Sequence, residues 1–255
     1  MLSNPLNTIF IGQVLHQYDD LDSTNALAFE MASKSNPIEG TAITTHYQSE
    51  GKGQIGSTWH SEPFMNLLTS IILTPRFLSL KDQFYLNIIS SLAVCDVLEH
   101  YFINDLAIKW PNDVYVGNQK IGGILVQSIL EKASMKYAIL GIGLNVNQTL
   151  WPAELPNPIA MKMVDGNDIP LEEVRQLLYQ KLEYRYLSLK RAKYKELLEE
   201  YLELLYKKDV FSNFDQDGKQ FMGTIRGIDE EGRLVIEMPN GTFKNFRFRS
   251  IRFLP

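Results

Sequence analysis

The chain of 255 residues lacks features that define several classes of protein. Its single cysteine excludes an internal disulfide, and the apolar run around Cys95 predicts a buried, unreactive thiol. Positive charge is not in excess, because 25 Lys and Arg face 30 Asp and Glu, and the net charge of −5 argues against a dedicated nucleic-acid-binding protein. No apolar run reaches the roughly 18 residues of a membrane helix, and the first residues do not form a signal peptide. We therefore expect a cytoplasmic protein that does not associate with membranes.

The hydrophobic share of 45% is ample for a large core, and its periodicity changes along the chain. Strand-like and helix-like segments alternate over residues 1–207, which predicts an α+β domain with a mixed β-sheet and flanking helices. Residues 208–255 show short alternating segments separated by Asp-Gly, Glu-Gly and Asn-Gly turns, which predicts a small β-barrel domain. The strands expected in the first region are 13–20, 41–47, 66–73, 107–110, a hairpin at 113–127, and 136–145, and those expected in the second are 220–226, 234–238 and 242–248. The expected helices are 26–32, 80–102 and one or two within 171–205.

Three glycines within six residues follow the strand expected at 41–47. Gly51, Gly53 and Gly56 let the backbone fold closely around a ligand, and Lys52 adds a charge suited to a phosphate or a carboxylate. No Lys-Ser/Thr pair follows the last glycine, so the segment is not a Walker loop, and no helix start follows it as a dinucleotide fingerprint requires. On its own, the segment is equally consistent with a flexible surface loop.

A second segment brings an amide and a carboxylate together at the end of a short strand. In Lys109-Trp110-Pro111-Asn112-Asp113, the carboxylate has the oxygen chemistry of a Mg²⁺ ligand, and the amide can hydrogen-bond a base or a phosphate. Lys120 lies on the returning strand of an apolar hairpin, where an unpaired ammonium is costly. It therefore needs a carboxylate neighbour or an anionic ligand, unless its side chain extends to solvent.

A third segment carries glycines inside an apolar strand. Gly141 and Gly143 indicate close approach of another backbone or of a flat ligand. Asn145 follows them, and a polar side chain in the interior of the protein needs a definite hydrogen-bond partner.

Taken in order, these segments closely resemble the catalytic domain of biotin protein ligases, from about Val14 to the C-terminus. The resemblance implies a biotin/lipoate ligase-like domain over residues 1–207 and a small SH3-like β-barrel over residues 208–255. Each motif is short, and the specificity comes from five of them occurring in register. The matching motifs are Asp22-Ser23-Thr24-Asn25, the glycine loop, Lys109-Trp110-Pro111-Asn112-Asp113, Lys120-x-Gly-Gly-Ile-Leu and Gly141-x-Gly-Leu-Asn.

The resemblance also implies a two-step reaction that uses biotin, ATP and Mg²⁺. Biotin and MgATP give biotinyl-5′-adenylate and pyrophosphate, and a lysine of a biotin carboxyl carrier protein then attacks the adenylate to form an amide. Lys52 and Lys120 are the implied catalytic residues, because preorganised positive charge stabilises the anionic centre of adenylation. Asp113 is the implied Mg²⁺ ligand, and we expect the glycine loop to become ordered when the site fills.

The implied binding residues suit the ligand. Because the ureido ring of biotin has two N–H donors and one carbonyl acceptor, its pocket needs side chains that both donate and accept hydrogen bonds. The implied biotin contacts are Ser23, Thr24, Asn25, Gln48, Gly51, Lys52, Gly53, Gln54, Lys120 and Gly123. The implied contacts to ATP or the adenylate are Lys52, Trp59, Asn112, Lys120 and Asn145.

Three departures from the family pattern affect these expectations. Gln54 stands where many members carry an arginine, which removes a charge that would help to retain the adenylate. Gln127 stands where a glutamate is common, so any ion pair of that residue is lost. Only 22 residues precede Ser23, fewer than the roughly 60 of a winged-helix domain, so we expect a monofunctional ligase that does not bind DNA. As a separate expectation, the protein is a monomer or a weak homodimer.

Other functions remain open from the sequence alone. A lipoate ligase shares the fold and chemistry, and a non-catalytic biotin sensor would keep the pocket without the reaction. Ala-Met-Lys-Met around Lys162 matches the acceptor tetrapeptide of carrier domains, but it lies among prolines and ahead of a long helix instead of at a hairpin tip. The basic side chains of the C-terminal region could contact nucleic acid, although closing the active site or docking the carrier fits the overall charge better. These side chains are Lys244, Arg247, Arg249 and Arg252.

Overall fold

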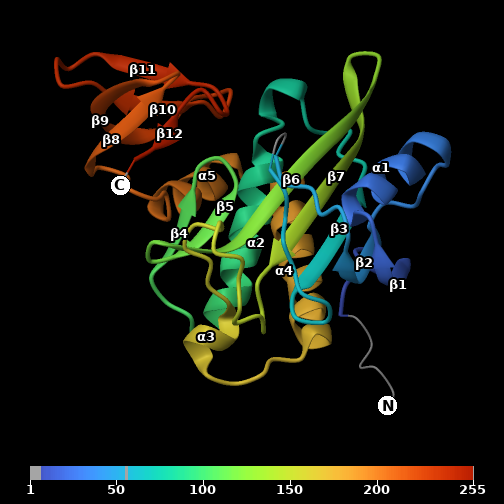
Figure 1. Ribbon diagram of the computed structural model, residues 1–255. Helices are drawn as coiled ribbons and strands as arrows, with labels where there is room; N and C mark the ends of the chain where they lie inside the picture. The colour runs from blue at the N-terminus through green and yellow to red at the C-terminus, as the bar shows by residue number, and fades with distance from the viewer. Residues whose placement is uncertain (1–6, 55–56, 255) are drawn as a thin grey trace.

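A mixed β-sheet forms the centre of the computed structural model, which describes residues 7–54 and 57–254. In this part of the chain the strand order is β1-β2-β3-β7-β6-β5-β4, and the β1–β2 pair is parallel while the other neighbours are antiparallel. Figure 1 shows the long β6–β7 hairpin crossing the middle of the sheet. The strands are β1 Leu15–Leu21, β2 Thr41–Gln48, β3 Leu67–Leu73, β4 Leu106–Lys109, β5 Asp113–Val116, β6 Gln119–Glu131 and β7 Ser134–Leu144.

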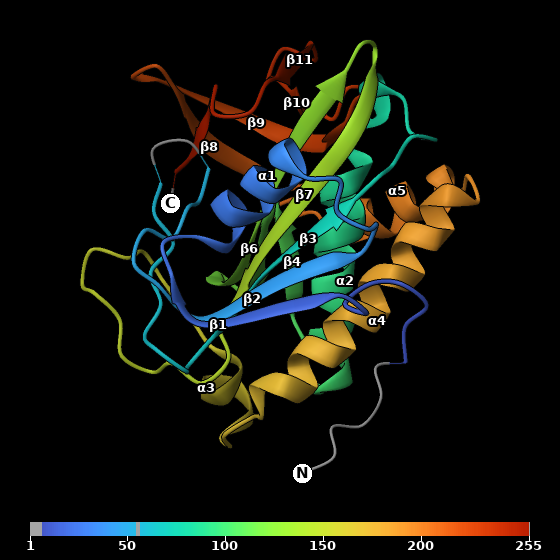
Figure 2. The ribbon, with the colours of Figure 1, turned by 90° about the vertical axis from the view of Figure 1, so that its right-hand side faces the viewer.

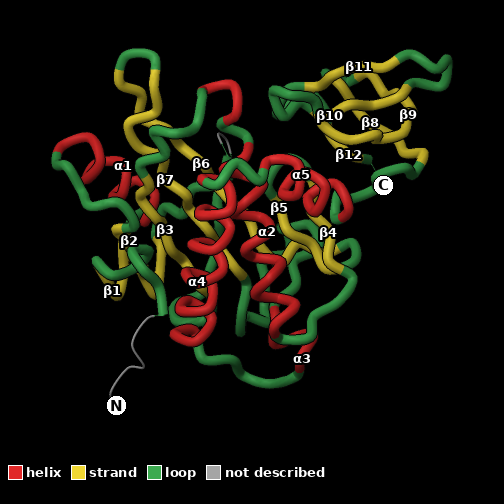
Figure 3. The backbone as a smooth tube through the Cα atoms, turned by 180° about the vertical axis from the view of Figure 1, so that it is seen from behind, coloured by secondary structure: helices red, strands yellow, loops and turns green. Residues whose placement is uncertain are grey.

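Helices cover both faces of this sheet, which explains why its central strands are apolar on both sides. Helix α1 lies on one face, and α2, α4 and α5 lie on the other (Figure 2, and Figure 3 from behind). Ser23 begins α1 by accepting a hydrogen bond from the Ala26 amide, and the small residues Ala28 and Ala32 let the helix approach the sheet closely. The helices are α1 Thr24–Lys34, α2 Tyr85–His100, α3 Met161–Asp165, α4 Leu171–Lys190 and α5 Tyr194–Glu203.

The single helix expected over residues 80–102 is divided in the structure. A 3₁₀ turn, η1 (Leu80–Asp82), comes first, and α2 begins only at Tyr85. The Ser79 hydroxyl donates to the Asp82 carboxylate at 2.6 Å, which stabilises the tight turn locally. Periodicity could not reveal this break, because the apolar spacing continues through it.

The C-terminal region forms a second sheet, antiparallel throughout, in the order β11-β10-β9-β8-β12. The expected all-β character is confirmed, but among the described residues β11 and β12 do not pair with each other, so a closed barrel is not observed. The division at residue 207 stays a prediction. The strands are β8 Phe211–Gln216, β9 Lys219–Ile228, β10 Leu234–Glu237, β11 Phe243–Phe246 and β12 Arg252–Phe253.

The two sheets are joined next to the Lys109–Asp113 turn. Trp110 is 4% exposed, and its indole N–H donates to the Gly232 carbonyl at 2.9 Å. Phe248 lies against the Trp110 ring with 5.3 Å between centroids. Two turns of the C-terminal region, at Gly232 and Phe248, therefore pack against Trp110.

None of the described helices combines the length and the apolar character needed to cross a bilayer.

Candidate active site

One cavity of about 180 Å³ lies at the α1 side of the sheet, where several of the sequence motifs meet. The start of α1, the loop after β2, the turn before β5 and the neighbouring strands β6 and β7 contribute its walls. Because these segments are far apart in the sequence, only the fold brings them together. The predicted site residues that line it are Ser23, Thr24, Asn25, Gln48, Lys52, Gly53, Gln54, Trp59, Asn112, Asp113, Lys120 and Gly123.

The polar residues implied for biotin form one connected group. The backbone amide and the hydroxyl of Thr24 donate to Gln48 Oε1 at 2.8 and 3.1 Å. The Ser70 hydroxyl donates to the Thr24 hydroxyl at 2.9 Å from β3 below. These bonds fix the orientation of the Gln48 amide, whose Nε2 end remains a hydrogen-bond donor.

Asn25 has a buried acceptor without a partner. Its Nδ2 donates to the Leu125 carbonyl at 3.3 Å, whereas Oδ1 has no hydrogen-bond partner among the described residues. A Cβ on Gly141 would lie 2.4 Å from Asn25 Nδ2, so only glycine there leaves room for this side chain. A buried, unpartnered carbonyl in a cavity wall is costly unless a ligand or water donates to it.

The glycine loop is the segment from Gly51 to Trp59, and two backbone hydrogen bonds connect its two arms. The Trp59 amide donates to the Gly51 carbonyl at 2.8 Å, and the Gly53 amide donates to the Ser57 carbonyl at 3.0 Å. Gly51 is buried beside Trp59 and Gln48 outside the cavity wall, and residues 55 and 56 of the motif lie outside the described residues. Lys52 is exposed and forms no ion pair within the described part of the chain, so its charge is available to a ligand.

Trp59 lies flat against two glycines of the sheet. A Cβ on Gly143 would lie 2.5 Å from its ring, and one on Gly123 would lie 3.0 Å from it. Gly143 is therefore closely approached, but by the indole side chain of Trp59 where a backbone or a flat ligand was expected. Trp59 Nε1 is buried and has no hydrogen-bond partner among the described residues.

Lys120 forms an ion pair with Asp113, with 2.7 Å between Nζ and Oδ1. The two residues belong to adjacent strands β5 and β6, where Lys120 pairs with Tyr115 and Asp113 pairs with Gly123, so the ion pair runs diagonally across the two strands. Their side chains are 32% and 28% exposed, and Lys120 Nζ lies 5.5 Å from the Trp59 ring. Of the alternatives that the sequence left open for Lys120, the carboxylate neighbour is the one observed.

Lys109 adds a second ammonium near this pair. Burial lowers the pKa of Lys109 from its ordinary value, and the neighbouring Asp113 acts in the opposite direction. Lys109 Nζ donates to the Tyr115 hydroxyl at 3.2 Å and lies 5.1 Å from the Phe253 ring of β12. Lys109 was not predicted as a site residue, and it does not line the cavity.

Asn112 and Gln54 link the turn to the glycine loop. Gln54 Nε2 donates to Asn112 Oδ1 at 2.9 Å, and Asn112 Nδ2 donates to the Ile124 carbonyl. Gln54 thus makes a neutral bridge across the cavity. Gln127, the other departure, is exposed on β6 and does not line the cavity.

Asn145 lies behind the cavity wall and does not line it. Its Nδ2 donates to the carbonyls of Ile159 at 2.9 Å and Lys120 at 3.4 Å, so it attaches the segment after β7 to the start of β6. Oδ1 has no partner among the described residues. The observed contacts support the position of Lys120, and a contact with nucleotide stays a prediction.

Some cavity residues were not anticipated as contacts, because they carry no chemical signal in the sequence. They contribute apolar surface, backbone or small polar groups. They are Ser57, Thr58, Leu68, Thr69, Pro111, Ile124, Leu125, Gly141, Ile142 and Gly143.

Two residues singled out in the sequence lie elsewhere. Cys95 is 2% exposed in α2, and burial raises the pKa of its thiol, as expected for an unreactive cysteine. Lys162 lies on the short helix α3 and forms an ion pair with Asp168 at 2.8 Å. It is not at a hairpin tip, which is the setting that an acceptor lysine requires.

Comparison with known proteins agrees with this geometry. Residues 18–145 match the model of the biotin/lipoate A/B protein ligase family. The bifunctional ligase/repressor BirA of Bacillus subtilis is 30% identical over 249 residues, which cover 94% of this chain and 74% of that protein. The biotin–[acetyl-CoA-carboxylase] ligase of Mycobacterium tuberculosis is 26% identical over 226 residues, covering 86% of this chain and 82% of that protein.

Among solved structures, the biotin protein ligase of Aquifex aeolicus in complex with biotin and ATP superposes with a TM-score of 0.79. It is 25% identical in sequence, and the match covers 95% of this chain and all of that one. The shared architecture includes both the mixed sheet and the C-terminal antiparallel sheet.

Proposed function

The chain belongs to the biotin/lipoate A/B protein ligase family, and on that premise we propose that it is a biotin protein ligase. It is an enzyme that activates biotin with MgATP and transfers it to a lysine of a biotin carboxyl carrier protein. One observation carries the proposal: a pocket of amide and hydroxyl groups opens into the same cavity as two lysines and a carboxylate. The polar pocket suits a ureido ring, and the charged groups suit the reacting phosphate and carboxylate.

The ureido end of biotin binds at the start of α1. Asn25 Oδ1, the buried acceptor without a partner, takes a ureido N–H. Gln48 already uses Oε1 for Thr24, which leaves Nε2 to donate to the ureido carbonyl. Lipoate has no ureido group, so it would leave these polar groups without partners at a cost of about 1–3 kcal/mol each.

The carboxylate of biotin then lies toward Lys52 and Lys120, where the first reaction occurs. A carboxylate oxygen attacks the α-phosphorus of ATP, the bond from that phosphorus to the bridging oxygen breaks, and pyrophosphate leaves. Both ammonium groups stabilise the negative charge that accumulates on the α-phosphate oxygens. Asp113 fits the Mg²⁺ that arrives with ATP, because this ion is commonly held by one or two carboxylates together with substrate phosphates.

In the second reaction, the deprotonated amine of the carrier lysine attacks the acyl carbon of the adenylate. The bond from that carbon to the phosphate oxygen breaks, AMP leaves, and the nitrogen loses a proton as the amide forms. Trp59 covers the sheet at this point, and the Gln54–Asn112 bridge holds the glycine loop near it. Both contacts help to keep water from the anhydride.

The partners follow from this assignment and from the charge of the chain. The acceptor is the carrier domain of a biotin-dependent carboxylase, and the net charge of −5 supports a ligase that does not bind DNA. A cytoplasmic location is part of the same proposal. The C-terminal sheet, which packs against Trp110, assists in closing the site or docking the carrier. A monomer or a weak homodimer remains our prediction.

Three measurements test the proposal with purified protein. Pyrophosphate release from ATP should require biotin; if biotin binds but releases none, the protein is a sensor. Biotin should displace lipoate in a competition binding experiment, and tighter binding of lipoate would indicate a lipoate ligase instead. Labelled biotin should transfer to a carrier domain, while intact-mass analysis of the ligase should show no adduct on Lys162.

A further inference from the structure

A series of hydrogen bonds connects strand β3 to the wall of the candidate active site. Ser70 of β3 is fully buried, and its hydroxyl donates to the Thr24 hydroxyl at 2.9 Å. The Thr24 hydroxyl in turn donates to Gln48 Oε1 at 3.1 Å. Thr24 and Gln48 line the cavity, whereas Ser70 does not. Any effect of Ser70 on a ligand therefore passes through its neighbours.

The direction of each hydrogen bond follows from the hydrogens that are available. The Thr24 backbone amide can only donate, and it lies 2.8 Å from Gln48 Oε1, so the carbonyl end of the Gln48 side chain must face it. The Thr24 hydroxyl has one hydrogen, which it donates to the same oxygen. Its own oxygen remains an acceptor, and Ser70 donates to it. Ser70 therefore keeps the Thr24 hydroxyl in the role of a donor toward Gln48.

These contacts fix one end of the Gln48 amide and leave the other end free. Oε1 accepts from both groups of Thr24, whereas Nε2 has no partner among the described residues, and the side chain is only half-buried. Turning the amide around would place the Nε2 hydrogens against the two donors of Thr24. Gln48 is therefore held so that it offers the cavity hydrogen-bond donors and not an acceptor.

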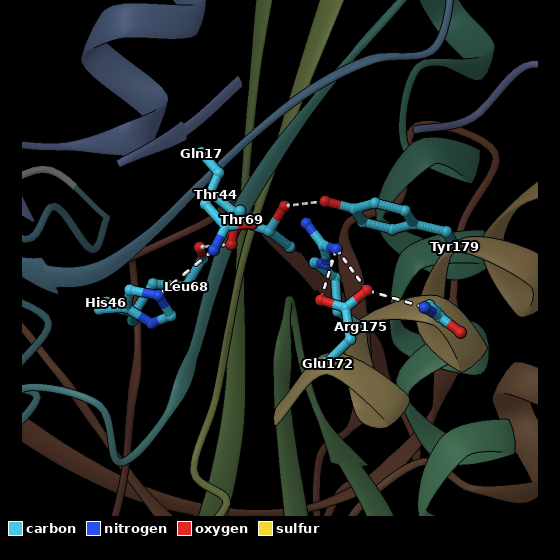
Figure 4. Close-up of polar contacts among 9 residues, drawn as sticks. Gln17, Thr44, His46, Leu68, Thr69, Glu172, Arg175 and Tyr179 are labelled. Carbon is cyan, nitrogen blue, oxygen red and sulfur yellow. Dashed lines mark hydrogen bonds and ion pairs between the residues drawn. The ribbon is translucent and has the colours of Figure 1, made fainter. Parts of the chain in front are cut away.

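The preceding residue of β3 makes a matched bond on the opposite face of the sheet. The Thr69 hydroxyl forms a hydrogen bond of 2.8 Å with the hydroxyl of Tyr179 on α4 (Figure 4). Tyr179 is fully buried, as Ser70 is, and it does not line the candidate active site. The two hydroxyl–hydroxyl bonds are alike in length and burial, but only the bond of Ser70 continues to Gln48.

We propose that Ser70 is a positioning residue that makes the site specific for a cyclic urea over a cyclic guanidinium. The inference rests on the proposed function, in which Gln48 Nε2 donates to the ureido carbonyl of biotin. A guanidinium of the same shape carries N–H groups where the urea has its oxygen, so it presents donors to the donors of Gln48. Because the amide cannot turn without losing its bonds to Thr24, the site should reject the guanidinium.

Titration calorimetry at neutral pH tests the inference with biotin and iminobiotin, in which an imino group replaces the ureido oxygen. The unchanged chain should bind iminobiotin at least about tenfold more weakly than biotin. Ser70→Ala should weaken biotin binding by about three- to tenfold, the loss of one neutral hydrogen bond, and should change iminobiotin binding by less than about twofold. The ratio of the two affinities should therefore fall. Tyr179→Phe removes the matched bond and should leave this ratio unchanged.

A double-mutant cycle shows whether Ser70 acts through Thr24. In a Thr24→Val background, Ser70→Ala should change the affinity ratio by less than about twofold, because the hydroxyl that Ser70 positions is absent. An equal change in both backgrounds would overturn the proposal, and so would an equal effect of Tyr179→Phe, because either result would indicate a general loosening of the sheet. Equal binding of biotin and iminobiotin by the unchanged chain would also overturn it.

Two further outcomes are distinguishable from these. If the unchanged chain does not bind biotin, the proposed function is refuted, and this inference with it. If Ser70→Ala does not fold, proton exchange in the unchanged chain gives the answer. The hydroxyl protons of Ser70 and Thr24 should both exchange slowly with water, and rapid exchange of either would show that the series of hydrogen bonds does not form.

Discussion

A second ion pair of the chain, Lys162–Asp168, serves as a control for Asp113–Lys120. Comparing the two separates an effect on catalysis from an effect on stability. Lys162 also pairs with one aspartate, at 2.8 Å instead of 2.7 Å, and both lysine side chains are 32% exposed. Substituting either lysine by alanine therefore removes an equally exposed ammonium, although Asp113 is 28% and Asp168 77% exposed. Only Lys120 lies in the candidate active site.

For Lys120→Ala, the expected loss of transition-state stabilisation is larger than the expected loss of folding free energy. Each substitution should lower the free energy of unfolding by no more than about 1 kcal/mol, because solvent screens pairs of this exposure. Removing a preorganised positive donor from a reacting anion typically costs about 10²–10³ in rate, or about 2.7–4 kcal/mol of transition-state stabilisation. Lys120→Ala should show that loss, and Lys162→Ala should retain the activity of the unchanged chain.

Biotin-dependent exchange of labelled pyrophosphate into ATP measures the first reaction without a carrier protein. Urea denaturation of both variants measures stability on the same preparations. The reasoning is refuted if Lys120→Ala exchanges pyrophosphate within about twofold of the unchanged chain. It also fails if the two variants lose activity equally, because a general structural effect would then explain both.

Further expectations concern Trp59, the N-terminal segment and the cysteine. Gly143→Ala should displace the Trp59 ring, because the added Cβ would lie 2.5 Å from it. Since a misplacement of about 1 Å can cost about 10²-fold in rate, adenylate formation should fall by about that factor. The far-UV circular dichroism spectrum should stay unchanged. Glu183→Ala should lower the urea-derived free energy of unfolding by about 2–3 kcal/mol, because Glu183 accepts the amides of residues 9–11. Since burial raises the thiol pKa, Cys95 should not react with a thiol reagent at pH 8 until the chain unfolds.

Much of the fold could be predicted from local sequence patterns. The hairpin turning at Gly117-Asn118 and the strand over Thr41–Gln48 appear where periodicity and turn residues indicate them. Neither β8 nor β12 was predicted, and the two-residue strand β12 has no such pattern. Its place is determined by pairing with β8, a contact between residues distant in sequence.

The site shows the same division between local and long-range information. The need of Lys120 for a carboxylate neighbour or an anionic ligand could be inferred, but the sequence did not distinguish these from a side chain that extends to solvent. The Gln54–Asn112 bridge could not be inferred, since 58 positions separate its two members. Gly143 indicated a close neighbour but not that the neighbour would be Trp59, whose position depends on how the whole glycine loop closes.

The Asp113–Lys120 pair also explains how the cavity can keep a cation before its substrates bind. A partly buried ammonium without a partner would be costly, and Asp113 offsets this cost while fixing the position of Nζ. Asp113 is also the residue proposed to meet the Mg²⁺ that accompanies ATP. As that contact forms, Lys120 would exchange its carboxylate partner for phosphate oxygens, so the positive charge becomes available when the reacting anion arrives. Asp113→Asn should therefore leave Lys120 Nζ less firmly positioned before the substrates bind, and it should weaken the binding of MgATP. Lys120→Ala should act mainly on the rate of adenylate formation.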